Sequence, residues 1–88
     1  MANKPKILIV DDEPRMRKSL KIMLSSQDYV LETCNSAKEA IKYLEKELFD
    51  LVLLDIFMPQ ENGYKVMDYI TSQSLKTSVI VITGFAST

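Results

Sequence analysis

Two stretches of the sequence decide the fold: Ile7-Leu8-Ile9-Val10-Asp11-Asp12 and Leu51-Val52-Leu53-Leu54-Asp55. In each stretch an apolar run without alternation ends in one or two carboxylates. Such runs of Ile, Val and Leu are typical of parallel strands that are covered on both faces. If the two runs are neighbouring strands, their carboxylates meet just outside the carboxyl ends of the strands, where open α/β sheets bind ligands. The two stretches therefore predict one acidic pocket.

The predicted cluster of carboxylates favours the binding of a cation. Like charges a few Å apart in a half-buried cleft repel one another and raise one another's pKa. A hard cation that prefers oxygen ligands neutralises this repulsion, and Mg²⁺ is the natural choice. We therefore predict that Asp11, Asp12 and Asp55 form a Mg²⁺ site. Taken alone, the Asp11-Asp12 pair has an alternative interpretation as a cap for a helix that begins near Pro14.

Two further segments complete a set of four strands. Val79–Ile82 is another unbroken apolar run, and Tyr29–Cys34 is a more polar strand candidate of the kind found at a sheet edge. Helical patterns separate the four segments, so the predicted order is βαβαβαβ. Right-handed crossovers then build a parallel sheet with helices on both faces, which is a doubly wound α/β fold.

Three helices are predicted between the strands. The first begins at Pro14, which a first helical turn tolerates, and the second follows a capping box made by Ser36 and Glu39. The third follows the chain break at Asn62-Gly63 and fades into the polar stretch 71–78. Each helix has an apolar stripe that is expected to face the sheet. In the first helix the stripe is Met16, Leu20, Met23 and Leu24, and in the third it is Val66, Met67 and Ile70. In the second helix it is Ala37, Ala40, Ile41 and Leu44, with Leu48 as a candidate last member.

Composition excludes several classes of protein. The chain has 88 residues, 47% of them hydrophobic and 26% charged, which fits one compact domain. A formal net charge of -1, with the lysines spread along the sequence, gives no electrostatic footprint for nucleic acid. With no His and one Cys, the chain can form neither a disulfide framework nor a Cys/His zinc site. Cys34 is therefore predicted to be a packed, reduced thiol.

The sequence carries no sign of a membrane or export signal. No apolar run approaches the roughly 18 residues that a membrane-spanning helix needs. The apolar run that follows Lys4 and Lys6 is interrupted by Asp11-Asp12, which is unlike a signal peptide. We therefore expect a cytoplasmic chain with no membrane partner.

The same residues resemble the receiver domain of two-component response regulators, which has a CheY-like (flavodoxin-like) fold. The resemblance covers essentially the whole chain, and the joint occurrence of several separately placed motifs makes it specific. These motifs are Ile7–Pro14 with its Asp pair, Asp50–Pro59 with Met58-Pro59 after Asp55, Gly63, and Val79–Ala86 with Thr83-Gly84. The resemblance implies a phosphorelay protein that is no enzyme beyond its own Mg²⁺-dependent phosphorylation and dephosphorylation.

Carried over residue by residue, the resemblance implies a role for each of five residues. Asp55 would accept a phosphoryl group from a sensor histidine kinase. Asp11 and Asp12 would hold Mg²⁺ directly or through water. An oxygen of Asp55 and the backbone carbonyl of Phe57 would complete the metal site, and the Phe57 side chain would cover the pocket and slow hydrolysis. Thr83 would hydrogen-bond the bound phosphoryl group.

The sequence departs from the family pattern at its C-terminal end. Receiver domains have five βα units, whereas this sequence stops just after the fourth strand, so we expect a C-terminally incomplete receiver domain over residues 1–88. The lysine and the aromatic switch residue of the fifth strand then have no counterpart. We therefore expect phosphorylation to be slow or absent, and metal binding to be less affected than phosphorylation. The fourth strand would expose apolar surface, which predicts self-association, a partner chain or a longer parent protein.

Three other functions compete with this interpretation. A dehalogenase-type phosphatase needs a second aspartate two residues after the nucleophile, where this chain has Phe57. A nucleotide- or flavin-binding protein needs a Gly-rich loop after the first strand, and the only glycines are Gly63 and Gly84. A truncated receiver that takes no phosphate and acts only in self-association or protein interaction remains open.

Overall fold

Four parallel strands form one sheet in the computed structural model of the chain, which describes residues 4–55, 57–58 and 61–82. Across the sheet the order is β2-β1-β3-β6, so the predicted doubly wound fold is confirmed, with the more polar strand at one edge. No helix among these described residues has the length and apolar character that crossing a bilayer requires. The main elements are β1 (Lys6–Val10), α1 (Pro14–Ser25), β2 (Val30–Cys34), α2 (Ala37–Lys46), β3 (Leu51–Asp55), α3 (Tyr64–Ser72) and β6 (Ser78–Ile82).

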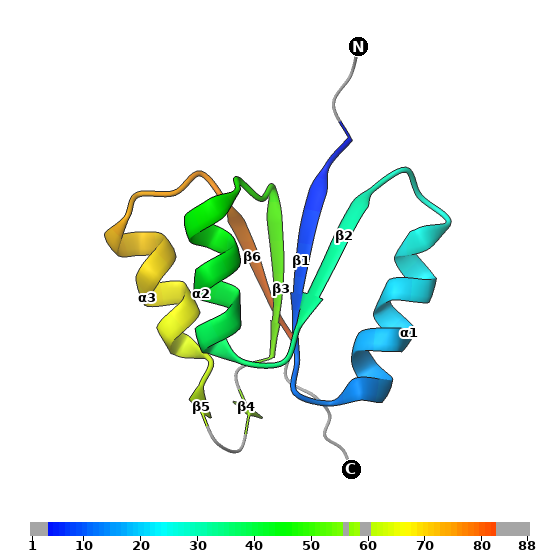
Figure 1. Cartoon of the computed structure of the whole chain (residues 1–88), viewed down its shortest axis with the longest axis horizontal. Coiled ribbons are helices and arrows are strands. Elements are labelled where there is room, and N and C mark those ends of the chain that lie inside the picture. The colour runs from blue at the N-terminus through cyan, green and yellow to red at the C-terminus, as the bar shows by residue number, and fades with distance from the viewer. Residues whose placement is uncertain (1–3, 56, 59–60, 83–88) are drawn as a thin grey trace.

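One element was not predicted. A short antiparallel pair, β4 (Phe57–Met58) and β5 (Glu61–Asn62), lies between β3 and α3. Figure 1 shows this pair beyond the carboxyl end of β3. The sequence predicted only a break at Asn62-Gly63, because strands of two residues are too short to show an alternating pattern.

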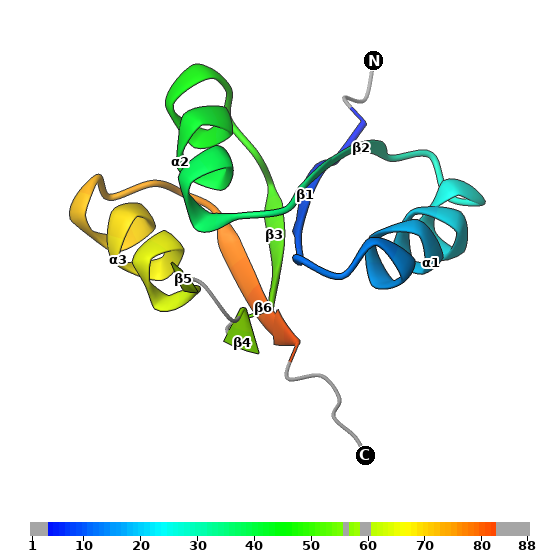
Figure 2. The same cartoon turned by 60° about the horizontal axis from the view of Figure 1, so that its bottom comes forward.

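The helices cover both faces of the sheet. Helices α2 and α3 lie on one side and α1 lies on the other (Figures 1 and 2). Alternate residues of β1 point to the two layers: Leu8 and Val10 join the cluster under α2 and α3, whereas Ile7 and Ile9 join the cluster under α1. All four side chains are buried. Because neither face of the strand meets water, the apolar run needs no polar alternation.

The larger of the two hydrophobic clusters includes a residue that the sequence did not single out. Phe49 is 2% exposed and packs edge-on against Tyr43, with the ring centroids 6.1 Å apart. It lies in the connection between α2 and β3, outside any periodic pattern. A single aromatic residue in a connection gives no periodicity signal, so only the tertiary structure identifies it as core.

Helix α2 begins as the sequence predicts but ends earlier. The Ser36 side chain accepts a hydrogen bond from the Glu39 amide at 3.1 Å, which is half of a capping box. In a full capping box the Glu39 side chain would accept from the amide of Ser36. Here the Glu39 carboxylate accepts instead from the amide of the preceding residue, Asn35, at 3.3 Å. The helix ends at Lys46, and Leu48 beyond it is 74% exposed. Placing Leu48 on the buried stripe was therefore wrong.

Helix α1 packs less tightly than the other two helices. None of its residues is fully buried, and Leu20 and Leu24 are the members that pack against the cluster under α1. Met23 is 67% exposed, so its assignment to the buried stripe was wrong. At 3.6 residues per turn, Met23 points about 80° away from the mean direction of Leu20 and Leu24. It therefore falls at the margin of the stripe.

Strand β6 exposes apolar side chains, as the sequence predicted for its fourth strand. Ile80 is 53% exposed and Val81 is 38% exposed. Ile80 is in register with Leu53 of β3, so the two side chains share one face of the sheet. Among the described residues, β6 is an edge strand. Its outer edge and this part of the α1 face are thus left uncovered by the described elements.

A matched pair of leucines tests the end of α2. Leu44 is 5% exposed and Leu48 is 74% exposed. Leu44→Ala should lower the free energy of unfolding by about 2 to 5 kcal/mol, because it empties space in the core. Leu48→Ala should change it by less than about 0.5 kcal/mol. Urea unfolding followed by circular dichroism measures both values, and equal losses in the two variants would contradict this description of α2.

Candidate metal centre

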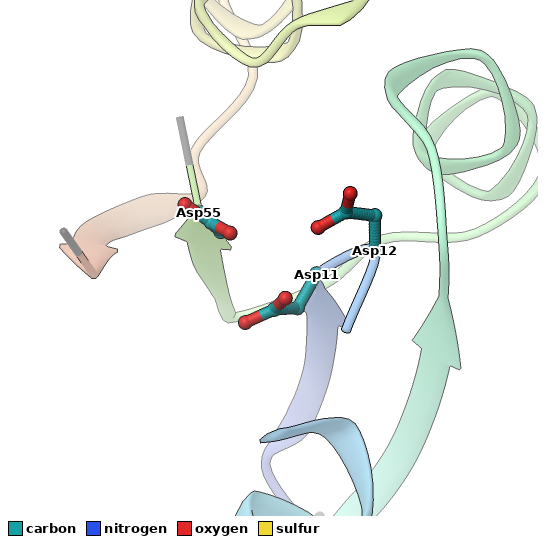
Figure 3. Close-up of side chains that lie close together, drawn as sticks. All are labelled: Asp11, Asp12 and Asp55. Atoms are coloured by element: carbon teal, nitrogen blue, oxygen red, sulfur yellow. The ribbon is translucent and has the colours of Figure 1, made fainter. Parts of the chain in front are cut away.

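The carboxyl ends of two adjacent strands bring three aspartates together. Asp55 is the last residue of β3, and Asp11 and Asp12 directly follow β1. The register pairs Val10 with Leu54, so the next residue along each strand brings Asp11 beside Asp55. One carboxylate oxygen from each of the three aspartates lies within 4.8 Å of the other two. Figure 3 shows the three side chains gathered at this edge of the sheet, as the sequence predicted.

The turn between β1 and α1 fixes Asp11 through its backbone and its side chain. Its amide donates to the carbonyl of Cys34 at 3.2 Å, which continues the β1–β2 pairing by one residue. Its Oδ1 atom accepts from the amide of Glu13 at 2.9 Å. Its carbonyl oxygen accepts from Nη1 of Arg17 at 2.8 Å. Sequence reasoning missed Arg17, because a basic residue in the first turns of a surface helix gives no distinctive signal.

The alternative that the Asp pair caps α1 does not match the structure. The residue at the N-cap position is Glu13, and its side chain makes no capping hydrogen bond. The Asp11 carboxylate bonds to the amide of Glu13 itself, which precedes the helix. The first turn of α1 holds no acidic residue. The two aspartates are therefore placed toward the pocket rather than used to start the helix.

Burial makes the cluster electrostatically unfavourable when all its members are ionised. Asp11 is 3% exposed and Asp55 is 9% exposed. Loss of solvent around Asp11 raises its pKa to about 6, with further increases from the charges of Asp55 and Asp12, while the hydrogen bond from the Glu13 amide opposes the rise. A divalent cation would reverse this penalty. Mg²⁺ is a hard cation that takes oxygen ligands, carboxylates among them, so the oxygens of these three side chains fit it.

The other residues that the resemblance implicated lie wholly or partly outside the described residues. Thr83, Pro59 and Gly84 are not described, and neither is the Phe57 side chain. The backbone of Phe57 opens β4, two residues after Asp55. The metal-binding role of the Phe57 carbonyl, the cover by its side chain and the phosphoryl hydrogen bond of Thr83 all stay predictions. Gly63 is buried and immediately precedes α3.

Cys34 is the packed thiol that the sequence predicted. It is 4% exposed and belongs to the cluster under α2 and α3. Burial raises the pKa of the Cys34 thiol to about 12, so the reactive thiolate is scarcely populated at neutral pH.

The strand order β2-β1-β3-β6 is that of the flavodoxin-like doubly wound sheets, to which CheY belongs, and the three aspartates lie at the carboxyl ends of the strands, where such sheets bind ligands. The family model described as the response regulator receiver domain matches residues 7–88. The chain therefore belongs to the response regulator receiver domain family of two-component systems.

Relatives in sequence are larger regulatory proteins. The chain is 36% identical over 85 residues to the response regulator protein PilR of Pseudomonas aeruginosa, covering 97% of this chain and 19% of PilR. It is 39% identical over 84 residues to the probable transcriptional regulator ycf27 of Guillardia theta, covering 96% of this chain and 33% of ycf27. The transcriptional regulatory protein ResD of Bacillus subtilis is 36% identical over 82 residues, covering 93% of this chain and 34% of ResD. The chain thus spans about a third or less of these relatives.

Solved receiver structures share the fold. The chemotaxis response regulator CheY4 of Vibrio cholerae superposes with a TM-score of 0.86 at 28% identity, covering 97% of this chain and 72% of CheY4. The response regulator protein TrrA of Thermotoga maritima, solved in complex with Mg(2+)-BeF, gives a TM-score of 0.84 at 35% identity, covering 93% of this chain and 71% of TrrA. The fold, including the order of the strands that position the aspartates, is thus common to this chain and these proteins.

The raised pKa of Asp11 makes stability depend on pH. The group's pKa is about 6 in the folded chain against a reference value of 3.8, so its stabilising contribution is complete below about pH 4 and is lost as the pH rises through 6. In EDTA, the free energy of unfolding should fall by about 1 to 3 kcal/mol between pH 5 and 7.5. Urea unfolding at several pH values measures the fall.

Two variants control this pH dependence. Asp11→Asn removes the titrating carboxyl group and should flatten the profile between pH 5 and 7.5. Asp68→Asn alters an exposed aspartate on α3 and should leave the profile unchanged. A profile of the same slope in Asp11→Asn and the parent would contradict the electrostatic description of the pocket.

Proposed function

We propose that this chain is a phosphoacceptor receiver domain in which Asp55 takes a phosphoryl group from a sensor histidine kinase, in a Mg²⁺-dependent reaction that switches signalling. The observation that carries the proposal is the meeting of three carboxylates at the carboxyl ends of β1 and β3, with one oxygen of each within 4.8 Å of the other two. Membership of the receiver family supports the same role. The interaction-only alternative is not favoured, because a surface that merely binds a partner has no need of an acidic cluster in which two carboxylates, those of Asp11 and Asp55, are buried.

Asp55 suits the role of nucleophile. A carboxylate is a competent nucleophile at neutral pH without a general base, which matters in a chain that has no His. In the proposed reaction a carboxylate oxygen of Asp55 attacks phosphorus and forms an acyl phosphate. The bond from phosphorus to the imidazole nitrogen of the kinase breaks, and its electron pair stays on the imidazole. The low exposure of Asp55 limits attack to donors that enter the pocket.

Asp11 and Asp12 would hold the cation beside the nucleophile. When bound, Mg²⁺ supplies positive charge for the phosphoryl oxygens, on which charge accumulates in the transition state. Asp11 has to release its proton before it can act as a ligand, because its pKa is raised to about 6 by burial and by its acidic neighbours. Cation affinity should therefore increase as the pH rises through this value.

The partners follow from the proposed reaction. A sensor histidine kinase is the phosphoryl donor, and the cytoplasmic location stays a prediction of the sequence. The net charge of -1 gives no reason to propose direct binding of nucleic acid by these residues. The exposed Ile80 and Val81 on β6 support the further proposal that this edge associates with a second copy or with another polypeptide segment. The incomplete-domain interpretation of residues 1–88 likewise stays a proposal.

Intact-mass measurement tests the phosphoacceptor. The chain is incubated with Mg²⁺ and acetyl phosphate, and the parent should gain the mass of one phosphoryl group, slowly, because the lysine of the fifth strand has no counterpart in this sequence. Asp55→Asn should gain none, because the amide is not a nucleophile at neutral pH. Asp50→Asn should behave like the parent, because Asp50 directly precedes the amino end of β3, away from Asp55, and its carboxylate accepts from the amide of Lys6.

Three outcomes would count against the proposal. Equal modification of Asp55→Asn and the parent would place the acceptor elsewhere. Transfer that is unchanged in EDTA would remove the metal from the reaction. No transfer to the parent at saturating donor would favour the interaction-only alternative.

A further inference from the structure

We propose that Arg17 is a positioning residue for the metal site, which acts by holding the backbone of Asp11 and so fixing the direction of the Asp11 carboxylate. The proposal rests on the proposed function, because it assumes that the aspartates bind a divalent cation. It gives a role to a basic residue that touches the turn between β1 and α1 rather than the reacting atoms.

The contact is made where the chain leaves the sheet. Arg17 lies in the second turn of α1, and its own amide donates to the Glu13 carbonyl at 3.1 Å. Its side chain reaches back along the helix, and Nη1 donates to the carbonyl oxygen of Asp11 at 2.8 Å in a partly buried setting. The guanidinium thus links the first turns of α1 to the residue directly after β1. Loss of this link would leave Asp11 with its remaining hydrogen bonds to Cys34 and Glu13 among the described residues.

This hydrogen bond completes the set that orients Asp11. The amide of Asp11 is held by Cys34 of β2, and Oδ1 is held by the amide of Glu13. With the carbonyl held by Arg17, the peptide groups on both sides of the residue are fixed. Such partners behind a metal ligand commonly set its orientation, and their removal typically costs 10- to 100-fold in metal affinity.

The proposed effect of Arg17 on Mg²⁺ binding comes from the hydrogen bond that positions Asp11 and not from the charge of the guanidinium. The Nη1 atom of Arg17 contacts the neutral backbone carbonyl of Asp11. The two possible effects of Arg17 also have opposite signs. A guanidinium near a cation site repels the cation, so removing its charge alone would strengthen Mg²⁺ binding. Removing a positioning hydrogen bond would weaken it.

Isothermal titration of the 88-residue chain with Mg²⁺ tests the proposal. Arg17→Met keeps most of the side-chain stem and removes the donors, and it should raise the Kd for Mg²⁺ about tenfold. Arg15→Met is the matched control, because Arg15 is an exposed residue of the same helix and its substitution removes the same charge. The control should bind Mg²⁺ as the parent does or slightly more tightly. Arg17→Lys restores a charged donor and should recover affinity relative to Arg17→Met.

The outcomes separate this proposal from the proposed function. An unchanged or lower Kd in Arg17→Met would overturn the positioning role, and so would an Arg17→Lys variant that binds no better than Arg17→Met. Asp11→Asn is titrated beside them: if it binds Mg²⁺ as the parent does, the proposed metal site itself fails. Thermal unfolding establishes that each variant is folded at the titration temperature. If Arg17→Met is not folded, Arg17→Gln takes its place, with the same expected rise in Kd.

Discussion

Repulsion among buried carboxylates is the constraint on which the site depends, and the pairing of β1 with β3 creates it. The register of these two strands is fixed because both faces of each strand are buried, and a shift by one residue would turn every side chain to the wrong layer. The same register places Asp11 beside Asp55. The packing that stabilises the sheet therefore also forces together charges that destabilise it. A cation that binds only the folded chain would offset this penalty and make stability depend on its concentration.

The turn between β1 and α1 connects the pocket to the least tightly packed helix. Helix α1 has no fully buried residue, whereas α2 buries Ala37, Ala40 and Leu44. Hydrogen bonds therefore have a larger part in holding the start of α1, and one of them is the bond from Arg17 to the Asp11 carbonyl. Through this bond the backbone of Asp11, one of the proposed metal ligands, depends on the placement of a surface helix.

The sequence was most informative where one physical rule acted alone. Unbroken apolar runs predicted the central strands, because these strands are buried on both faces. The aspartates that follow the runs predicted the acidic cluster, because adjacent parallel strands end at the same edge of the sheet. The prediction failed where tertiary packing decides, as for Met23 at the margin of a stripe and Leu48 beyond the end of α2. Phe49 and Arg17 act through contacts with distant or non-periodic partners, which no local pattern records. The two-residue strands β4 and β5 are too short for any periodicity to show.

We expect three carboxylates at the carboxyl ends of β1 and β3 to bind one divalent cation. Mn²⁺ prefers the same oxygen ligands as Mg²⁺ and broadens nearby NMR signals, so a titration of the amide spectrum tests the claim most directly. Below one equivalent, Mn²⁺ should broaden the amide signals of Asp11, Asp12 and Asp55 before all others, and excess Mg²⁺ should restore them. Broadening that instead follows exposed acidic residues such as Glu39 and Glu45 of α2, and that Mg²⁺ does not reverse, would contradict the claim.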